Sequence, residues 1–319
     1  MMTLLALTSS VYAIDKNTVE VTYDGDKAVV TIADNISGYV SASIDRAYVK
    51  LTQAETVTDN APGEIFYILS GSTTDGSFYL SGSYKASVTL NGLTLTNPQG
   101  PAIDIQNGKR INLRIENETT NTLTDGAGGD WKGCFVCKGH TEFKGKGTLN
   151  VNGKTAHGIW SKEYVEIKNC SINVKGAKND GIHCQQYFKM TSGAVSISDV
   201  ADEGIRVELK GETPTAGSET EDEDTGNFYM AGGSLTINNV GEYCIKTDGT
   251  ISYTGGNQNF TLTNVQENAA TAIQSVQFSG NDTEAVFDLS GRQLPKDALR
   301  QKGIYIVRSQ QSTRKVIVK

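Results

Sequence analysis

The sequence has no long apolar segment and no helical periodicity in its middle part. No stretch approaches the roughly 20 consecutive apolar residues that a membrane-spanning helix needs, so no transmembrane segment is expected. The sequence also has no basic stripe interleaved with aromatic residues, and its net charge is −7. Nucleic acid is therefore not an expected partner.

Cysteine is scarce and odd in number, with five residues that include a Cys-x-x-Cys pair at Cys134 and Cys137. Such a pair can indicate a redox or metal site. Cys137, however, shares one column of the repeat described below with Cys184, and Cys134 lies in a column of small residues. Because a buried cysteine packs as a small hydrophobe, we interpret the cysteines as core residues, with zinc or redox chemistry as the alternative.

What the chain does contain is a recurring six-residue pattern. It reads PAIDIQ, GCFVCK, HGIWSK, DGIHCQ, EGIRVE and YCIKTD. The central apolar residues are Ile103, Phe135, Ile159, Ile182, Ile205 and Ile245. Their spacings of 32, 24, 23, 23 and 40 fit a period near 23 with one insert of 9 and one of 17. Self-similarity at a fixed period of this size indicates a solenoid.

Each hexamer alternates between apolar and polar residues, as a strand with one buried face does. The residue before each central apolar residue is small, which suits a tight corner. Two further strands follow in each period, because Ile167 to Met190 and Ile172 to Val195 are both 23 residues apart; Phe260 is expected in line with Leu235. The sequence therefore predicts an all-β, right-handed three-sheet parallel β-helix, the hand following the usual chirality of parallel crossovers.

The segments around the repeat suggest four parts. Residues 1–13 are typical of the end of a secretory signal peptide, with an ordinary disordered N-terminus as the alternative. Residues 14–60 contain an expected β-hairpin around Asp24-Gly25, residues 64–265 the β-helix, and residues 272–319 a small separate β module. The insert at residues 211–226 is acidic and is expected to be a mobile loop. The signal-like start predicts a secreted, cell-surface or periplasmic location.

Charge is distributed unevenly. Residues 131–178 hold nine lysines against three acids, a net charge of +6, whereas residues 199–224 hold ten acids against two basic residues, a net charge of −8. Basic coils in the middle of the chain could attract an acidic polymer. The alternative is a solvated, lysine-rich surface.

Residues 65–126, together with the later elements HGIWSK, KNDGIHC and ADEGIRV, resemble a family of secreted bacterial carbohydrate-binding β-helix proteins. That family includes a clostridial member that binds polygalacturonate, and it is similar in fold to family 9 polysaccharide lyases. The resemblance implies acidic-polysaccharide binding and bound calcium. The C-terminal elements VFDLSGRQLP, KGIYIV and KVIVK resemble C-terminal modules of secreted Bacteroidetes proteins, which implies export-related sorting or surface attachment; a plain C-terminal cap is the alternative.

Two groups of residues are candidate sites. The first is an outward-facing column on one sheet, extended by Lys138 and Lys162. We expect a sugar ring to stack on its aromatic face and uronate carboxylates to meet its cations. We call Trp160, His183, Arg206 and Lys246 the outward column. The second is a corner with oxygen ligands suited to calcium. Its members are Asn179, Asp180, Asp202 and Glu203, although Asp180 can instead cap a turn.

The sequence thus predicts non-catalytic binding of an acidic, polygalacturonate-like polysaccharide. One alternative is a calcium-dependent polysaccharide lyase, which needs a metal and a basic side chain such as Arg206, Lys246 or Lys162. The other is a structural surface protein or adhesin with a protein partner. The oligomeric state is left open by the sequence.

Overall fold

The computed structural model describes residues 14–211, 224–260, 265–266, 284–287, 293–294, 303–309 and 313–318. The chain divides into two compact units between Gln266 and Glu267. The signal-like residues 1–13 and most of the acidic insert lie outside the described residues. Among the described residues, no helix has both the length and the apolar character to cross a membrane.

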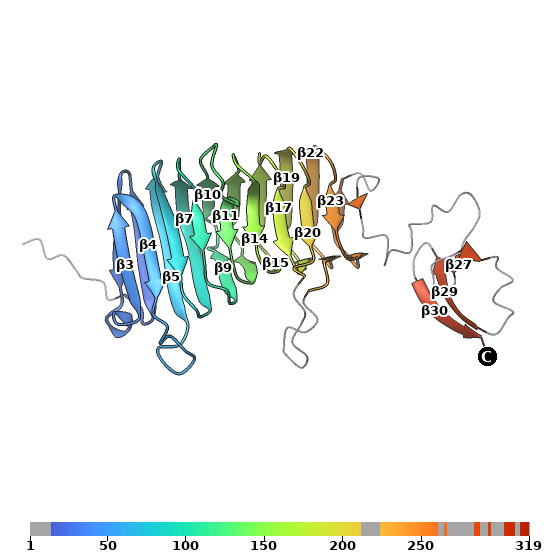
Figure 1. Cartoon of the computed structure of the whole chain (residues 1–319), viewed down its shortest axis with the longest axis horizontal. Helices are drawn as coiled ribbons and strands as arrows, with labels where there is room; N and C mark the ends of the chain where they lie inside the picture. Colours follow the sequence, from blue (N-terminus) through green and yellow to red (C-terminus); the bar gives the residue numbers. More distant parts are fainter. Residues whose placement is uncertain are drawn as a thin grey trace, which may run out of the picture. The chain divides into compact units, whose positions relative to one another are not determined.

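The first unit is built from strands stacked side by side in successive coils (Figure 1). One sheet, here the first sheet, has ten strands and is parallel from β4 onward. Its strands are β3 (Val40–Asp45), β4 (Ala47–Gln53), β6 (Gly76–Ser81), β8 (Ile103–Ile105), β11 (Gly133–Cys137), β14 (His157–Ser161), β17 (Ile182–Gln185), β20 (Ile205–Glu208), β23 (Ile245–Thr247) and β26 (Val265–Gln266).

Two further rows of parallel strands complete each coil. The second row contains β9 (Ile111–Ile115), β12 (Thr141–Gly145), β15 (Val165–Ile167), β18 (Tyr187–Met190), β21 (Asn227–Met230) and β24 (Ile251–Tyr253). The third row contains β10 (Thr120–Thr124), β13 (Thr148–Asn152), β16 (Ser171–Lys175), β19 (Ala194–Val200), β22 (Ser234–Val240) and β25 (Asn257–Asn259). Three strands per coil, paired only with the coils before and after, make a parallel β-helix and confirm the predicted fold.

The second and third rows merge at one end of this unit. The long strand β7 (Ala86–Thr96) pairs through its first half with β9 and through its second half with β10. Strand β5 (Ile65–Thr73) follows β7 through the same bend, where the register shifts between Ser70 and Gly71. Gly92, at the bend of β7, has a φ of +71°, a conformation that glycine adopts without steric cost.

The expected internal ladder is present. Ile182 pairs in register with Ile159 on one side and Ile205 on the other, and all three side chains have no solvent exposure. Full burial of such a side chain contributes about 1.5–3 kcal/mol through the hydrophobic effect. The ladder fixes which side chains point outward, because a shift of one residue would turn every buried side chain to the solvent.

Small residues at the corner before each central residue are also required by packing. A Cβ placed on Gly158 would lie 2.7 Å from the carbonyl oxygen of Gly181, and one placed on Gly181 would lie 2.8 Å from that of Gly204. Each corner is therefore closed by the backbone of the next coil, which leaves little room for a side chain.

The N-terminal strands extend the coil. β1 (Thr18–Asp24) and β2 (Lys27–Ile32) form an antiparallel hairpin around Asp24-Gly25, and β1 also pairs in parallel with β5. β4 likewise pairs in parallel with β6. At the other end, Leu235 pairs with Gln258 rather than with Phe260, because the spacing of 23 leads to Gln258. The expected alignment of Phe260 with Leu235 was wrong by two residues.

The second unit holds a four-stranded antiparallel sheet in the order β28-β27-β29-β30. Its strands are β27 (Glu284–Phe287), β28 (Gln293–Leu294), β29 (Gly303–Ser309) and β30 (Thr313–Val318). Val286, Tyr305 and Val307 form its small core, with Leu294 packed against them.

Candidate functional site

The outward column lies on the first sheet in the register that the repeat predicts. Trp160 pairs with His183, His183 with Arg206, and Arg206 with Lys246. The four side chains therefore come from four successive strands, about 4.8 Å apart along the stack.

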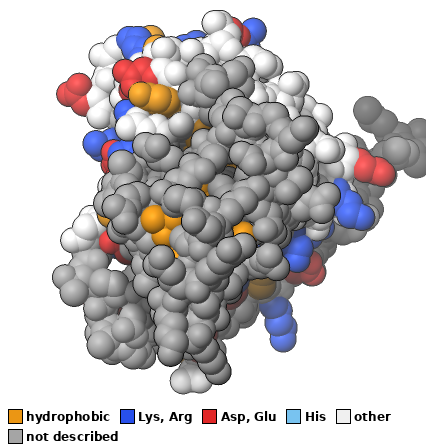
Figure 2. Space-filling model, turned by 90° about the vertical axis from the view of Figure 1, so that its right-hand side faces the viewer, with side chains coloured by type: hydrophobic (Ala, Val, Ile, Leu, Met, Phe, Trp, Pro, Cys, Tyr) orange, Lys and Arg blue, Asp and Glu red, His pale blue; other side chains and the backbone are white. Residues whose placement is uncertain are grey.

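The three polar members of the outward column already have carboxylate partners. Arg206 Nη2 lies 2.7 Å from Asp248 Oδ1 and 3.3 Å from Glu208 Oε1. His183 Nε2 lies 3.3 Å from Glu208 Oε2, and Lys246 pairs with Glu203. Both basic and acidic side chains are visible on the face shown in Figure 2. A uronate carboxylate would have to compete with these partners.

Trp160, Lys138 and Lys162 all keep some exposure to solvent. Lys138 is exposed, whereas Trp160 and Lys162 are partly exposed. Within the described residues no ion pair is found for either lysine. Their role as glycan ligands stays a prediction.

The predicted calcium corner brings three of its four side chains together. Asp180, Asp202 and Glu203 have carboxylate oxygens within 4.8 Å of one another, and Asp180 and Glu203 are buried. Asn179 is exposed, and its backbone carbonyl accepts the N–H of Asp202 at 3.2 Å. The carboxylates fit part of a calcium shell, which takes six to eight oxygens. Calcium binding stays a prediction.

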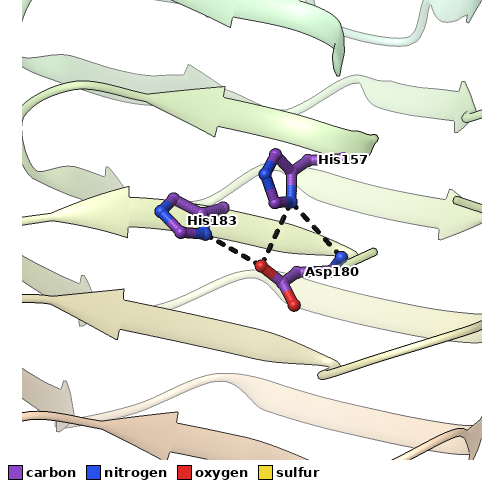
Figure 3. A group of neighbouring side chains, drawn as sticks. All are labelled: His157, Asp180 and His183. Atoms are coloured by element: carbon purple, nitrogen blue, oxygen red, sulfur yellow. Dashed lines mark hydrogen bonds and ion pairs between the residues drawn. The ribbon is translucent and has the colours of Figure 1, made fainter. Parts of the chain in front are cut away.

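His157 joins this corner from the preceding coil (Figure 3). His157 Nδ1 lies 3.1 Å from Asp180 Oδ2, and His183 Nδ1 lies 2.8 Å from the same oxygen. The imidazole ring centroids are 4.5 Å apart. We call His157, Asp180 and His183 the histidine–aspartate cluster. Each of the three is at most 8% exposed.

The corner separates the pKa values of its acids. Burial acts to raise the pKa of Asp180, but hydrogen bonds with His157 and His183 outweigh it and hold the pKa well below its ordinary value. Burial, followed by the hydrogen-bonded contact with Asp180, raises the pKa of Glu203 to about 7. The hydrogen bond with His183 lowers the pKa of Glu208 to about 2.

The two cluster histidines shift in opposite directions. Burial lowers the pKa of His157, although the hydrogen bond with Asp180 acts the other way. Burial also acts to lower the pKa of His183, but its contacts with Asp180 and Glu208 raise it overall. One histidine thus favours the neutral form and the other the charged form.

His157 is not among the site residues predicted from the sequence. The signal was available, because His157, Asp180 and Glu203 occupy one repeat position at intervals of 23 residues. An imidazole is not a ligand that calcium prefers, so the calcium prediction does not include His157.

A second feature missed by the sequence analysis is a basic pocket at the corner between the second and third rows. Its volume is about 390 Å³. It is lined by Arg114, Asn117, Lys144, Gly145, Lys146, Lys168 and Asn169. We call its four cations, Arg114, Lys144, Lys146 and Lys168, the basic corner.

The basic corner is assembled from strand ends and turns of successive coils. Arg114 and Lys144 are register partners, and the backbone N–H of Lys168 donates to the carbonyl of Phe143 at 2.9 Å. Arg114 pairs with Glu116 and Lys144 with Glu142. Lys146 and Lys168 are exposed, and no ion pair is found for them in the described part of the chain. None of the lining residues is acidic.

A stack of rings follows the turn between the first sheet and the second row. His140 lies on Tyr164 with ring centroids 4.4 Å apart, and Tyr164 lies on Tyr187 at 4.6 Å. Tyr164 and Tyr187 donate hydrogen bonds to Glu142 and Glu166. Burial, followed by the positive charge of Lys210, lowers the pKa of His140 to about 4.

The cysteines have no part in these sites. All five are buried, and Cys134, Cys137, Cys170 and Cys184 are free thiols. Burial raises the pKa of Cys137 to about 11, which is opposite to what a reactive thiol needs. The groups of metal-ligating side chains found in the described residues contain no cysteine. These facts support the interpretation of the cysteines as core residues.

Fold and surface together define a parallel β-helix with a charged corner and no helical domain in the described residues. A family described as "Carbohydrate-binding domain-containing protein" matches residues 53–298. The chain belongs to this family of carbohydrate-binding domain-containing proteins.

One relative is similar in sequence, and one solved structure is similar in fold. A carbohydrate-binding domain-containing protein of Acetivibrio thermocellus is 26% identical over 163 residues, which cover 48% of this chain and 51% of that protein. The chain thus spans about half the length of this relative. The structure of a polysaccharide lyase-like protein from C. thermocellum, a gadolinium derivative, matches with a TM-score of 0.56 and 20% identity. The match covers 78% of this chain and 99% of that one, and it shows a shared fold.

Proposed function

We propose that this protein binds carbohydrate without cleaving it, and that its ligand is an acidic polysaccharide held at the basic corner. The observation that carries the proposal is the pocket formed by Arg114, Lys144, Lys146 and Lys168, which no acidic side chain lines. Family membership supports the carbohydrate, and the charge of the pocket supports an acidic one.

Electrostatics explain why such a site needs an anion. Arg114 and Lys144 are register partners, and like charges directly opposite in a sheet are destabilising. The nearby carboxylates of Glu116 and Glu142 offset part of this repulsion, and the exposed Lys146 and Lys168 add to it. A polyanion lying along the stack would meet cations from successive coils and relieve the repulsion.

The outward column is the weaker candidate for recognising the carboxylates of the glycan. Its cations are paired with Asp248, Glu208 and Glu203. Trp160, with Lys138 and Lys162 beside it, can still offer a face for a sugar ring. The lyase alternative gains no support here, because a catalytic base needs a lowered pKa, whereas the hydrogen bond with Glu203 raises the pKa of Lys246.

Calcium, a secreted, cell-surface or periplasmic location and surface attachment through the C-terminal unit belong to the same proposal. Carboxylates at the corner of Asp180, Asp202 and Glu203 would supply oxygen ligands to a calcium ion. The signal-like start and the resemblance of the C-terminal elements support the location and the attachment.

The test is isothermal titration calorimetry, in which polygalacturonate is titrated into the full chain. The double variant K146Q/K168Q should bind about 5- to 30-fold more weakly, because each lost exposed ion pair removes about 0.5–1 kcal/mol. The matched control is K27Q/K154Q, which removes two exposed lysines outside the pocket. Equal affinity of the two double variants would refute the basic corner as the site. Absence of binding to any polysaccharide would favour the structural or adhesin alternative.

A further inference from the structure

The histidine–aspartate cluster has the geometry of a metal site. Each of its three residues offers one donor atom, and these atoms all lie within 4.8 Å of one another. His157 and His183 both approach Asp180 Oδ2 with Nδ1. The two nitrogens are 3.1 Å and 2.8 Å from the carboxylate oxygen. Zinc binds nitrogen and oxygen donors at about 2.0–2.2 Å, so donors about 3 to 4 Å apart can share one ion.

The donor set selects the kind of metal. Imidazole nitrogen suits zinc, copper, iron and nickel, whereas calcium and magnesium take oxygen ligands. Two imidazoles and one carboxylate therefore fit a first-row transition metal better than calcium. From this geometry we infer that His157, Asp180 and His183 form a binding site for a divalent transition-metal ion of the zinc type.

Surrounding contacts hold the ligands in orientations suited to an ion. Glu208 Oε2 lies 3.3 Å from His183 Nε2, on the ring edge opposite to Asp180. A carboxylate on the second nitrogen of a ligating histidine is the usual arrangement around protein-bound metals. Asp180 Oδ1 accepts the backbone N–H of Glu203 at 3.2 Å, which leaves Oδ2 for the ion.

His157 presents Nδ1 to the cluster. This nitrogen lies 3.1 Å from Asp180 Oδ2 and 3.3 Å from the backbone nitrogen of Asp180. A metal ion would take the place of the contact between Nδ1 and Oδ2, and its binding requires the neutral imidazole with Nδ1 unprotonated.

The site stands on rigid structure. Strands β14 and β17 are register partners, and the N–H of Gly158 donates to the carbonyl of Asp180 at 3.0 Å. Ligands held by paired strands keep their geometry better than ligands on loops. The chain supplies three ligands, so a water molecule or another small ligand would complete the coordination. Because Asp180 also belongs to the predicted calcium corner, the two metals should compete.

The experiment is equilibrium dialysis of the full chain against Zn²⁺ near pH 7.5, after removal of any affinity tag and treatment with a chelator. We expect one zinc ion per chain. The variants H157Q and H183Q should each weaken zinc binding by at least ~100-fold, because each removes a direct ligand, and E208Q by about 10- to 100-fold, because it removes the outer carboxylate. The chain has three histidines, so H140Q, the remaining one, is the matched control and should bind as the natural protein does.

A second readout keeps the test decisive if a variant does not fold. Co²⁺ bound by the natural protein should give weak visible bands typical of nitrogen and oxygen ligands, without the intense near-ultraviolet band of a thiolate ligand. Failure of the folded natural protein to bind zinc would overturn the inference. So would unchanged zinc binding by H157Q and H183Q, a thiolate band with Co²⁺, or an equal loss of affinity in H140Q. None of these outcomes depends on binding of a polysaccharide.

Discussion

Asp180 stands one coil after His157 at the same position of the repeat, with its Oδ2 atom 3.1 Å from His157 Nδ1. Residues 23 positions apart in the sequence therefore become direct neighbours in space. This relationship makes a solenoid corner chemically useful, because a change at one repeat position alters the contacts of the coils on both sides.

The internal ladder gives a stability prediction. Ile182 is fully buried between Ile159 and Ile205, so I182A should lower the free energy of unfolding by about 2–5 kcal/mol through lost burial and a cavity. Chemical denaturation, monitored by circular dichroism, measures the free energy of unfolding. I44A is the control, because Ile44 is 45% exposed. This variant should lower the free energy of unfolding much less than I182A does. Similar losses in both variants would contradict the ladder.

The corner glycines give a second prediction. In G204A the new Cβ would lie 2.6 Å from the carbonyl oxygen of Cys244 and 2.6 Å from a methyl group of Ile237. The neighbouring coil must shift, at a cost of about 1–3 kcal/mol in the free energy of unfolding. Gly38 has no neighbour within 4 Å of an added Cβ, so G38A should change stability by less than about 1 kcal/mol. A neutral G204A would show that the corner is looser than described.

The ring stack gives a pH prediction. His140 has a pKa of about 4 in the folded protein because it is buried and faces the positive charge of Lys210; Lys109 acts in the same direction, and Glu142 opposes them. In the unfolded chain its pKa is about 6.5, so the unfolded state takes up the proton first as the pH falls. Its contribution to stability is complete above about pH 6.5 and is lost as the pH falls towards 4.

The measurement compares the natural protein with H140Q by chemical denaturation at pH 7.5 and pH 4.5. From pH 7.5 to pH 4.5, the free energy of unfolding of the natural protein should fall by about 1–2 kcal/mol more than that of H140Q. This figure allows for partial exposure of the ring. Parallel pH profiles would mean that His140 titrates normally. Metal-chelating buffer keeps the histidine–aspartate cluster out of the comparison.

The outward column and the basic corner can be separated by a fourth prediction. R206A leaves Asp248 and Glu208 without their shared cation, so it should destabilise the fold by about 1–3 kcal/mol. Its affinity for polygalacturonate at a temperature well below unfolding should fall by less than about twofold, because the guanidinium is engaged within the protein. A larger loss of affinity than that of K146Q/K168Q would move the binding site to the outward column.

Much of the fold was predictable because the period of 23 appears directly in the sequence. Ile159, Ile182 and Ile205 fixed the register, and the register fixed which residues form the outward column. The ion pairs within that column were not predictable. Arg206 meets Asp248, 42 residues away and beyond the acidic insert, and only the geometry of the last coils brings them together.

The basic corner was hidden for a related reason. Lys144 pairs with Arg114, and the pairing of Phe143 with Ile167 places Lys168 one coil after Lys144. The insert between Arg114 and Lys144 obscures this shared repeat position, and Lys146 lies outside it in a turn. The lysine-rich composition of residues 131–178 indicated attraction to an acidic polymer, but not the pocket or the participation of Arg114.

The most direct test of the central claim is to compare polygalacturonate with its fully methyl-esterified form as ligands of the natural protein by isothermal calorimetry. Esterification keeps the sugar backbone and removes the negative charge. If the basic corner binds carboxylates, the ester should bind at least about tenfold more weakly, and the affinity for the charged polymer should fall as salt is added. Equal affinity for both polymers, unaffected by salt, would contradict the account.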